Sequence, residues 1–146
     1  MRVGEVRNRE RGEQRPLAGV SVLALEQMQA LPYGTQLLAH LGADVVKIEP
    51  PGRGESGRQA RPSIRDADGR EVGATFLRNN LSKRSLTLDL KQPVGCELFR
   101  RLAPHFDVVA ENLGPGTAER LGVDYASLAD RKSTRLNSSH SSVSRM

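Results

Sequence analysis

Aromatic residues are scarce in this sequence: Phe, Tyr and Trp together make up 3% of its 146 residues, and Trp is absent. The core must therefore be mainly aliphatic, and the composition argues against an aromatic stacking surface for single-stranded nucleic acid. Cysteine is equally scarce. The single Cys96 excludes a disulfide framework and a cysteine-ligated metal site within one chain, and no metal site is predicted.

Long apolar stretches are also missing. No run approaches the roughly 20 apolar residues that a membrane-spanning helix needs, and the sequence shows no secretory signal. We therefore expect a cytoplasmic protein without a membrane partner. A chain of 146 residues suits one domain with a proper core.

The formal net charge of +5 is concentrated at the two ends of the chain. Residues 1–15 contain five arginines, and residues 131–146 contain four Lys or Arg and no acid, whereas the part between them is close to neutral. A nucleic-acid-binding domain would carry its basic stripe on the folded body, so no nucleic-acid partner is predicted. Both ends lack a hydrophobic period and are predicted to be disordered, which leaves 16–130 as the folded unit.

Short apolar runs alternate with helical periods between residues 16 and 130. This pattern predicts strands at 20–25, 44–49, 84–90 and 106–110, the third with one covered face. It predicts helices from Pro32 to Gly42, over a short segment at 74–77, from Pro93 to Pro104, and after the turn at 114–116. The order β–α–β–loop–β–α–β–α indicates an α/β fold, a Rossmann-like parallel sheet with flanking helices.

Two segments between these elements bear on function. The first strand-to-helix turn, Glu26 to Leu31, lacks the Gly-x-Gly-x-x-Gly of dinucleotide-binding domains, so an ordinary NAD site is not predicted. Residues 50–73 have no hydrophobic period and mix arginines with acids such as Glu55 and Glu71. We interpret this stretch as a long solvated loop rather than a phosphate clamp.

The segment from Asp107 to Gly122 combines an apolar strand, a glycine–proline turn and a helix that starts at once. Such a turn presents backbone N–H groups at one point, where a parallel α/β sheet often places an anionic ligand. The acids in and after it, Asp107, Glu111, Asp124 and Asp130, are interpreted as helix caps or surface acids.

Four blocks of this sequence resemble the family III CoA-transferases, the CaiB/BaiF group. They are Pro16 to Leu23, Leu31 to Gly52 (containing Leu-Gly-Ala-Asp-Val-Val-Lys-Ile-Glu-Pro-Pro-Gly), Lys83 to Lys91, and Val109 to Gly116. Their order and intervals match the N-terminal segment of that family over about 16–129. The resemblance implies a partial N-terminal domain of the family's fold.

The resemblance also implies a reaction. Family members move CoA between carboxylic acids: an Asp carboxylate attacks the thioester, and an aspartyl-CoA thioester follows a mixed anhydride. The substrates are acyl-CoA and a carboxylic acid, no cofactor is tightly bound, and the full-length proteins form interlocked homodimers. The family's catalytic Asp would lie beyond residue 146, so no catalytic residue is expected in this chain. The Ser- and Arg-rich residues 131–146 depart from the family and are expected to be a non-native tail.

The family's coenzyme contacts correspond to positions at the ends of the predicted strands. The implied CoA-binding residues are Met28, Gln29, Leu88, Asp89, Leu90, Lys91, Asn112, Leu113, Gly114 and Arg120. Lys91 and Arg120 are expected to meet phosphates. Pro50 stands where some transferases have Arg, and Arg53 is a candidate to replace that Arg.

Two alternatives remain open at this point. An acyl-CoA racemase acting on 2-methylacyl-CoA would share this CoA-handling segment, and its catalytic His and Asp would also lie beyond the chain. A non-enzymatic nucleotide-binding module would instead use the basic ends.

Overall fold

The computed structural model describes residues 15–65 and 67–129. The predicted disordered segments 1–15 and 131–146 therefore lie outside the described residues, except for Arg15. Among the described helices, none is long and apolar enough to cross a membrane. The elements are β1 Ser21–Leu25, α1 Ala30–His40, β2 Asp44–Glu49, η1 Ser56–Gln59, β3 Ser63–Arg65, β4 Glu71–Gly73, α2 Ala74–Asn79, β5 Arg84–Thr87, α3 Pro93–Leu102, η2 Ala103–His105, β6 Val108–Glu111, α4 Thr117–Leu121 and α5 Tyr125–Ala129.

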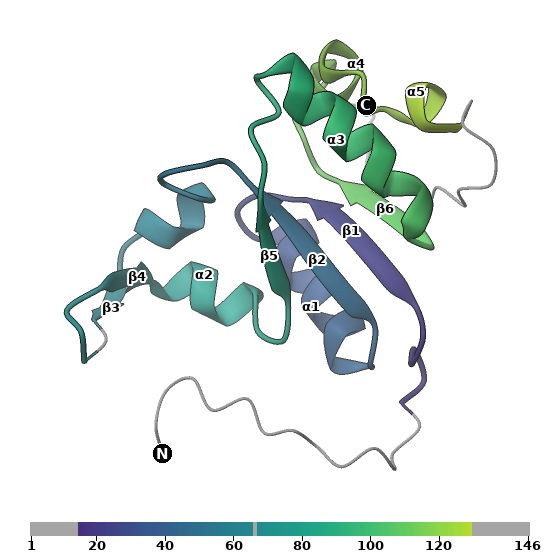
Figure 1. The fold of residues 1–146 in the computed structure, drawn as a ribbon. Helices are drawn as coiled ribbons and strands as arrows, with labels where there is room; N and C mark the ends of the chain where they lie inside the picture. Colours follow the sequence, from purple (N-terminus) through teal and green to yellow (C-terminus); the bar gives the residue numbers. More distant parts are fainter. Residues whose placement is uncertain (1–14, 66, 130–146) are drawn as a thin grey trace, which may run out of the picture.

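Four parallel strands form the main sheet in the order β5-β2-β1-β6 (Figure 1). In the centre, Leu23 of β1 is in register with Val46 of β2 on one side and with Val109 of β6 on the other. The chain leaves β1 toward β2 and returns to the opposite side of β1 as β6. The strand order therefore reverses at β1, and ligands of open α/β sheets bind at the carboxyl ends of the strands beside such a reversal.

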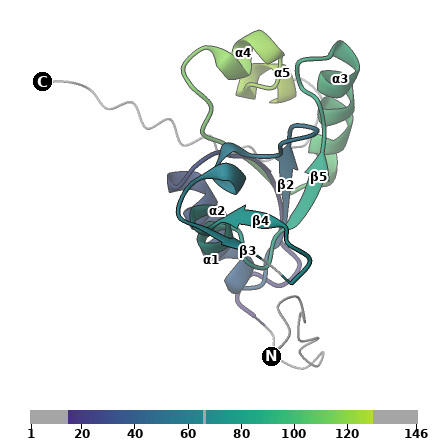
Figure 2. The ribbon, with the colours of Figure 1, turned by 90° about the vertical axis from the view of Figure 1, so that its left-hand side faces the viewer.

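Both faces of the sheet are covered at the central strand β1, whose alternate residues point to opposite sides. Leu23 and Leu25 belong to a core with Phe99 of α3 and Leu128 of α5, whereas Val22 and Ala24 pack with Ala39 of α1. Figures 1 and 2 show α1 on one face of the sheet and α3, α4 and α5 on the other. The predicted Rossmann-like α/β fold is thus confirmed.

Helix α1 shows how closely local sequence signals set the element boundaries. Pro32 lies in its first turn, where the missing N–H costs no helical hydrogen bond. The helix ends at His40, and Gly42 follows with φ +108°. The Ala43 N–H then donates to the Leu38 carbonyl at 3.0 Å, the bond that closes a glycine-terminated helix end.

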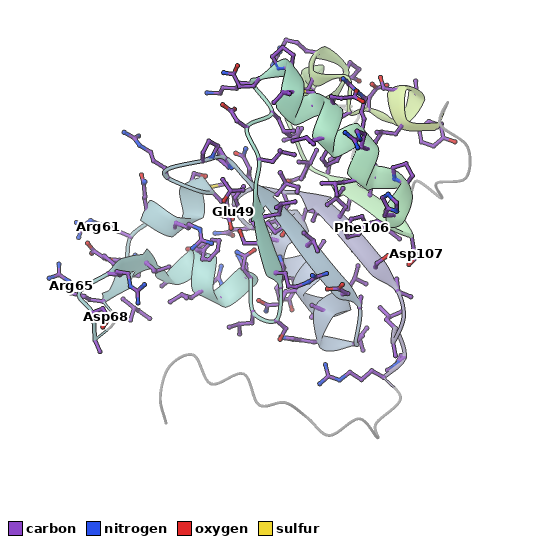
Figure 3. All side chains as sticks on the ribbon, viewed as in Figure 1. Glu49, Arg61, Arg65, Asp68, Phe106 and Asp107 are labelled. Carbon is purple, nitrogen blue, oxygen red and sulfur yellow. The ribbon has the colours of Figure 1, made fainter. Side chains whose placement is uncertain are left out.

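Two sequence-based predictions, one for residues 84–90 and one for residues 50–73, are wrong. Strand β5 stops at Thr87 and all four of its residues are exposed, so it has no covered face; Leu88 and Leu90 pack on the core only after the strand has ended. Residues 50–73 are not one solvated loop, because they contain η1 and the antiparallel β3–β4 hairpin. Arg61, Arg65 and Asp68 lie on or beside this hairpin, away from Glu49 in the sheet (Figure 3).

Candidate functional site

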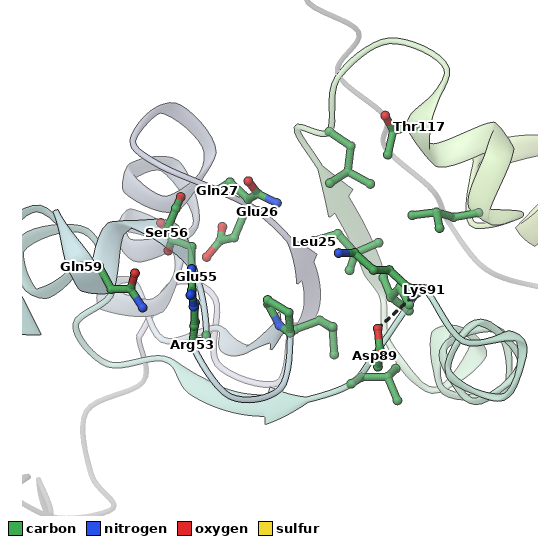
Figure 4. Close-up of a pocket in the computed structure, with 17 residues that line it drawn as sticks. Leu25, Glu26, Gln27, Arg53, Glu55, Ser56, Gln59, Asp89, Lys91 and Thr117 are labelled. Carbon is green, nitrogen blue, oxygen red and sulfur yellow. Dashed lines mark hydrogen bonds between the residues drawn. The ribbon is translucent and has the colours of Figure 1, made fainter.

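A cavity of about 450 Å³ lies at the carboxyl ends of the parallel strands (Figure 4). The lining comes from the ends of all four strands. Leu25, Glu26 and Gln27 line it at the end of β1, and Leu88 to Lys91 line it after β5. Six residues line it after β2, namely Pro50, Arg53, Gly54, Glu55, Ser56 and Gln59, and Leu113 lines it after β6. Thr117 and Leu121 of α4 complete the wall. The cavity therefore occupies the place where the reversal of strand order predicts a ligand.

The lining combines apolar side chains with two cations. Leu25, Ile48 and Leu88 contribute apolar surface, and Arg53 and Lys91 contribute positive charge. Within the described part of the chain, neither Arg53 nor Lys91 forms an ion pair, whereas both side chains are exposed. Such a cavity suits a ligand with an apolar or aromatic portion and an anionic portion.

Two acids of the cavity wall, Glu26 and Glu55, are neutralised by buried lysines. Lys47 Nζ donates to Glu55 Oε2 at 2.5 Å and lies 3.5 Å from Glu26 Oε1, and Lys83 Nζ donates to Glu26 Oε1 at 2.6 Å. Burial lowers the pKa of Lys83, although the carboxylate of Glu26 opposes that shift. Because these carboxylates are already paired with buried lysines, they leave the charge of Arg53 and Lys91 available for an anion.

A second, partly buried ion pair fixes the chain just after β2. Arg58 Nε donates to Glu49 Oε2 at 2.6 Å and Arg58 Nη2 to Glu49 Oε1 at 2.7 Å, and the guanidinium lies 3.8 Å from the centre of the Phe76 ring. Burial raises the pKa of Glu49, but hydrogen bonds from Arg58, Ser85 and the Glu55 N–H outweigh it and lower that pKa to about 2. The same pair raises the pKa of Arg58. The interpretation of Glu55 and Arg58 as members of a solvated loop is therefore wrong.

The structure brings half of the expected CoA-binding residues into this cavity. Leu88, Asp89, Leu90, Lys91 and Leu113 line it. The N–H of Lys91 donates to Asp89 Oδ1 at 3.0 Å, which shapes the turn that presents the Lys91 side chain (Figure 4).

The other expected residues surround the cavity without lining it. Met28 contacts the lining residue Ser56, whose Oγ donates to Met28 Sδ at 3.3 Å, and Gln29 is the exposed residue that precedes α1. Arg120 is exposed and donates to Thr117 Oγ1, and the Gly114 carbonyl accepts from the Thr117 N–H at 3.0 Å. Whether any of these residues touches CoA stays a prediction.

Asn112 has a structural task at the cavity's edge. Its Oδ1 accepts from the Gln27 N–H at 2.9 Å and its Nδ2 donates to the Gln27 carbonyl at 3.0 Å. These bonds tie the end of β6 to the end of β1.

In the same region α4 has only five residues and its first N–H is already bonded to Gly114. The sequence predicted several free backbone N–H groups at the start of this helix. In the structure the helix is short, and the turn before it already uses the first of these groups.

Sequence reasoning missed the lining residues Gln27, Ser56 and Gln59 and the buried partners Glu26, Lys47 and Glu55. One signal was present: Lys47 interrupts an apolar strand, and a charge inside a buried strand requires a partner.

The acids interpreted as caps or surface groups fit their surroundings. Asp124 accepts from the Ala126 N–H at the start of α5, Asp107 accepts from Ser21, and Glu111 accepts from the Leu113 N–H, whereas Asp130 lies outside the described residues.

The structure is an α/β unit with a cavity at the carboxyl ends of its parallel strands, and comparison with known proteins gives its family. The model of CoA-transferase family III matches residues 17–134. The chain belongs to CoA-transferase family III, which confirms the resemblance noted in the sequence.

The relatives are much longer than this chain. It is 42% identical over 115 residues to the succinate–glutarate CoA-transferase of Agrobacterium fabrum, which covers 77% of this chain and 29% of that protein. It is 43% identical over 106 residues to a formyl-CoA:oxalate CoA-transferase of Bradyrhizobium diazoefficiens, which covers 73% of this chain and 24% of that protein. The chain thus spans less than a third of the length of these curated relatives.

Solved structures also match most of this chain, and the match again covers about a third of their own length. A CAIB/BAIF family protein from Brucella suis superposes with a TM-score of 0.72 at 40% identity, over 80% of this chain and 30% of that one. Rv3272 from Mycobacterium tuberculosis superposes with a TM-score of 0.73 at 37% identity, over 85% of this chain and 33% of that one.

Proposed function

We propose that the cavity binds the coenzyme A portion of an acyl-CoA, and that this chain is the CoA-binding N-terminal part of an enzyme that transfers CoA between carboxylic acids. One observation carries the proposal. The cavity combines apolar side chains with the cations Lys91 and Arg53, and the five residues Leu88–Lys91 and Leu113 that the family resemblance assigns to CoA line it together. An adenine ring suits the leucine surface, and phosphates suit the two cations.

The catalytic carboxylate of the transfer reaction lies outside this chain in our proposal. An attacking Asp must approach a thioester with an oxygen that is not held by other groups. The buried acids of the cavity wall do not meet this need, because Glu26 and Glu55 are paired with Lys83 and Lys47. The complete enzyme would supply the Asp, the acyl pocket and the second copy of a homodimer.

Calorimetric titration of the 146-residue chain with CoA tests the binding proposal. We expect saturable binding, and we expect Lys91→Ala to raise the dissociation constant about tenfold, because one charge-assisted contact with a phosphate is lost. Arg101→Ala is the matched control. Arg101 is an exposed cation of α3 that does not line the cavity, so its removal should leave the dissociation constant unchanged. Absence of CoA binding, or equal effects of the two substitutions, would contradict the proposal.

An acyl-CoA racemase would hold the coenzyme in the same cavity. Binding tests on this chain therefore address the coenzyme site, and the residues after position 146 decide between the two reactions. A Gly-rich segment with an Asp in the downstream reading frame favours the transferase, and a His–Asp pair favours the racemase.

A further inference from the structure

Met28 has a backbone conformation that a side chain normally avoids. Its φ is +66°, in the left-handed region, although it is not a glycine. It lies beside the cavity, because it directly follows the lining residue Gln27 and its sulfur contacts the lining residue Ser56. Strained backbone of this kind persists only where the surrounding groups hold it.

Two buried side chains from distant parts of the chain hold the Met28 backbone. The Met28 N–H donates to Glu55 Oε1 at 3.0 Å, and Asn79 Nδ2 donates to the Met28 carbonyl at 3.4 Å. Glu55 and Asn79 are only 2% and 1% exposed. Both ends of the strained residue are therefore bonded to the protein interior.

The Glu55 carboxylate is fixed from several directions at once. Oε1 also accepts from the Gly57 N–H at 3.1 Å, while Oε2 accepts from Lys47 Nζ at 2.5 Å. The Glu55 N–H donates to Glu49 Oε2 at 3.0 Å. One oxygen thus pairs with the buried lysine, and the other accepts from backbone N–H groups of two separate segments, at Met28 and at Gly57.

We propose that Glu55 is a positioning residue for the coenzyme: it holds the Met28–Gln29 turn and the 55–57 segment in their binding arrangement before the ligand arrives. This inference rests on the proposed CoA site. A wall that is ordered in advance does not lose conformational freedom on binding, so its loss lowers affinity without removing any contact to the ligand. Among the interactions of the described residues, Oε1 accepts from the Met28 N–H and the Gly57 N–H, so this oxygen links the turn before α1 to the start of η1, and both segments lie beside the cavity.

Gly57→Ala displaces this carboxylate without changing any charge. A Cβ at residue 57 would lie 2.6 Å from Glu55 Oε1, and the next atoms are at 3.4 Å and 3.7 Å, so the end of the Glu55 side chain must move. Gly34→Ala is the matched control, because a Cβ there meets nothing within 4 Å. We expect Gly57→Ala to raise the dissociation constant for CoA about tenfold and to speed amide hydrogen exchange at Met28, with neither change in Gly34→Ala.

A pair of uncharged double variants separates the hydrogen bond from the ion pair. Lys47→Met with Glu55→Gln keeps an amide oxygen that accepts from the Met28 N–H, and Lys47→Met with Glu55→Leu does not. Both remove one charge of each sign, and Glu26 keeps its bond to Lys83. We expect the Gln variant to bind CoA within about threefold of the unmodified chain and to protect the Met28 amide, and the Leu variant to bind at least about tenfold more weakly and to lose that protection.

The outcomes distinguish this inference from the proposed function. If the unmodified chain does not bind CoA, the proposed function fails, and unchanged exchange at Met28 in Gly57→Ala would overturn the positioning role on its own. If the unmodified chain binds CoA but the Gln and Leu variants bind equally well, the positioning role is overturned and the proposed function stands. Should the Leu variant not unfold cooperatively, the comparison of Gly57→Ala with Gly34→Ala decides.

Discussion

Arg58 donates a hydrogen bond to each carboxylate oxygen of Glu49, with N–O distances of 2.6 Å and 2.7 Å. Glu49 is the last residue of β2, and Arg58 lies in η1. The pair therefore ties the segment that forms one wall of the cavity back onto the sheet.

Removal of Arg58 should destabilise the fold strongly. Arg58→Ala leaves the buried carboxylate of Glu49 without its partner, and we expect the free energy of unfolding to fall by about 2–4 kcal/mol, somewhat less than for a fully buried pair because Arg58 is partly exposed. Arg84→Ala is the control: Arg84 pairs with Asp44, both exposed, so the expected loss is below about 1 kcal/mol. Urea unfolding of the two variants measures the difference. Similar losses in the two variants would contradict this prediction, because the Arg58–Glu49 pair would then stabilise the fold no more than the exposed Arg84–Asp44 pair.

The depressed pKa of Glu49 makes stability depend on pH in a defined window. Because its folded-state pKa is about 2 and the ordinary value is 4.5, its contribution is fully present above pH 4.5 and is lost as the pH falls from 4.5 toward 2. The full loss amounts to about 3 kcal/mol. Urea unfolding between pH 6 and pH 2.5 should show a shallower acid dependence for Glu49→Gln than for the unmodified chain. Parallel curves for the two proteins would contradict this assignment.

Gly95 allows α3 to approach the turn that carries Lys91. A Cβ at residue 95 would lie 1.9 Å from the Asp89 carbonyl oxygen, which is backbone and cannot swing aside. Gly95→Ala should therefore shift the 89–91 turn, cost about 1–3 kcal/mol of stability and weaken CoA binding. Gly34→Ala, in a helix with open space around it, should be neutral or stabilising by up to about 1 kcal/mol. Calorimetry and urea unfolding on both variants check this, and unchanged CoA affinity in Gly95→Ala would count against the turn as part of the site.

Deletion of the two basic ends separates the CoA site from a tail-based binding module. A chain of residues 16–130 keeps every residue that lines the cavity, so its dissociation constant for CoA should equal that of the 146-residue chain. A module that binds through its basic ends would instead lose affinity on deletion, and its binding before deletion would weaken steeply with salt. Titrations of both chains at low and physiological salt measure the two quantities.

The sequence was sufficient to predict the sheet but not the wall of its cavity. Apolar runs such as Val45-Val46 and Leu23-Ala24-Leu25 identify buried strands, because both faces of a parallel sheet are covered. The family resemblance assigned Leu88 to Lys91 and Leu113 to CoA; these residues line one cavity, and their contact with CoA stays a prediction.

The 50–73 segment could not be predicted because polar contacts organise it. Glu55 and Arg58 look like solvent-exposed charges in the sequence, and only their partners Lys47 and Glu49, in the sheet, explain their burial. Hydrophobic period carries no information on such long-range ion pairs. The alternation after Arg84 misled in the opposite way, since Leu88 and Leu90 reach the core from a turn and not from a strand.

The central position of β1 also constrains the order of folding. Its pairing with β2 closes a short connection through α1, whereas its pairing with β6 brings Ser21 to Asp107, 86 positions later in the chain. The entropy lost in closing a connection grows with its length, and contacts between distant positions slow folding. During synthesis the β1–α1–β2 unit can form as soon as it emerges. The edge of β1 that pairs with β6 lacks its partner strand until β6 has been made. The cavity, which needs the ends of both β1 and β6, is therefore completed only when the last strand of the described sheet joins.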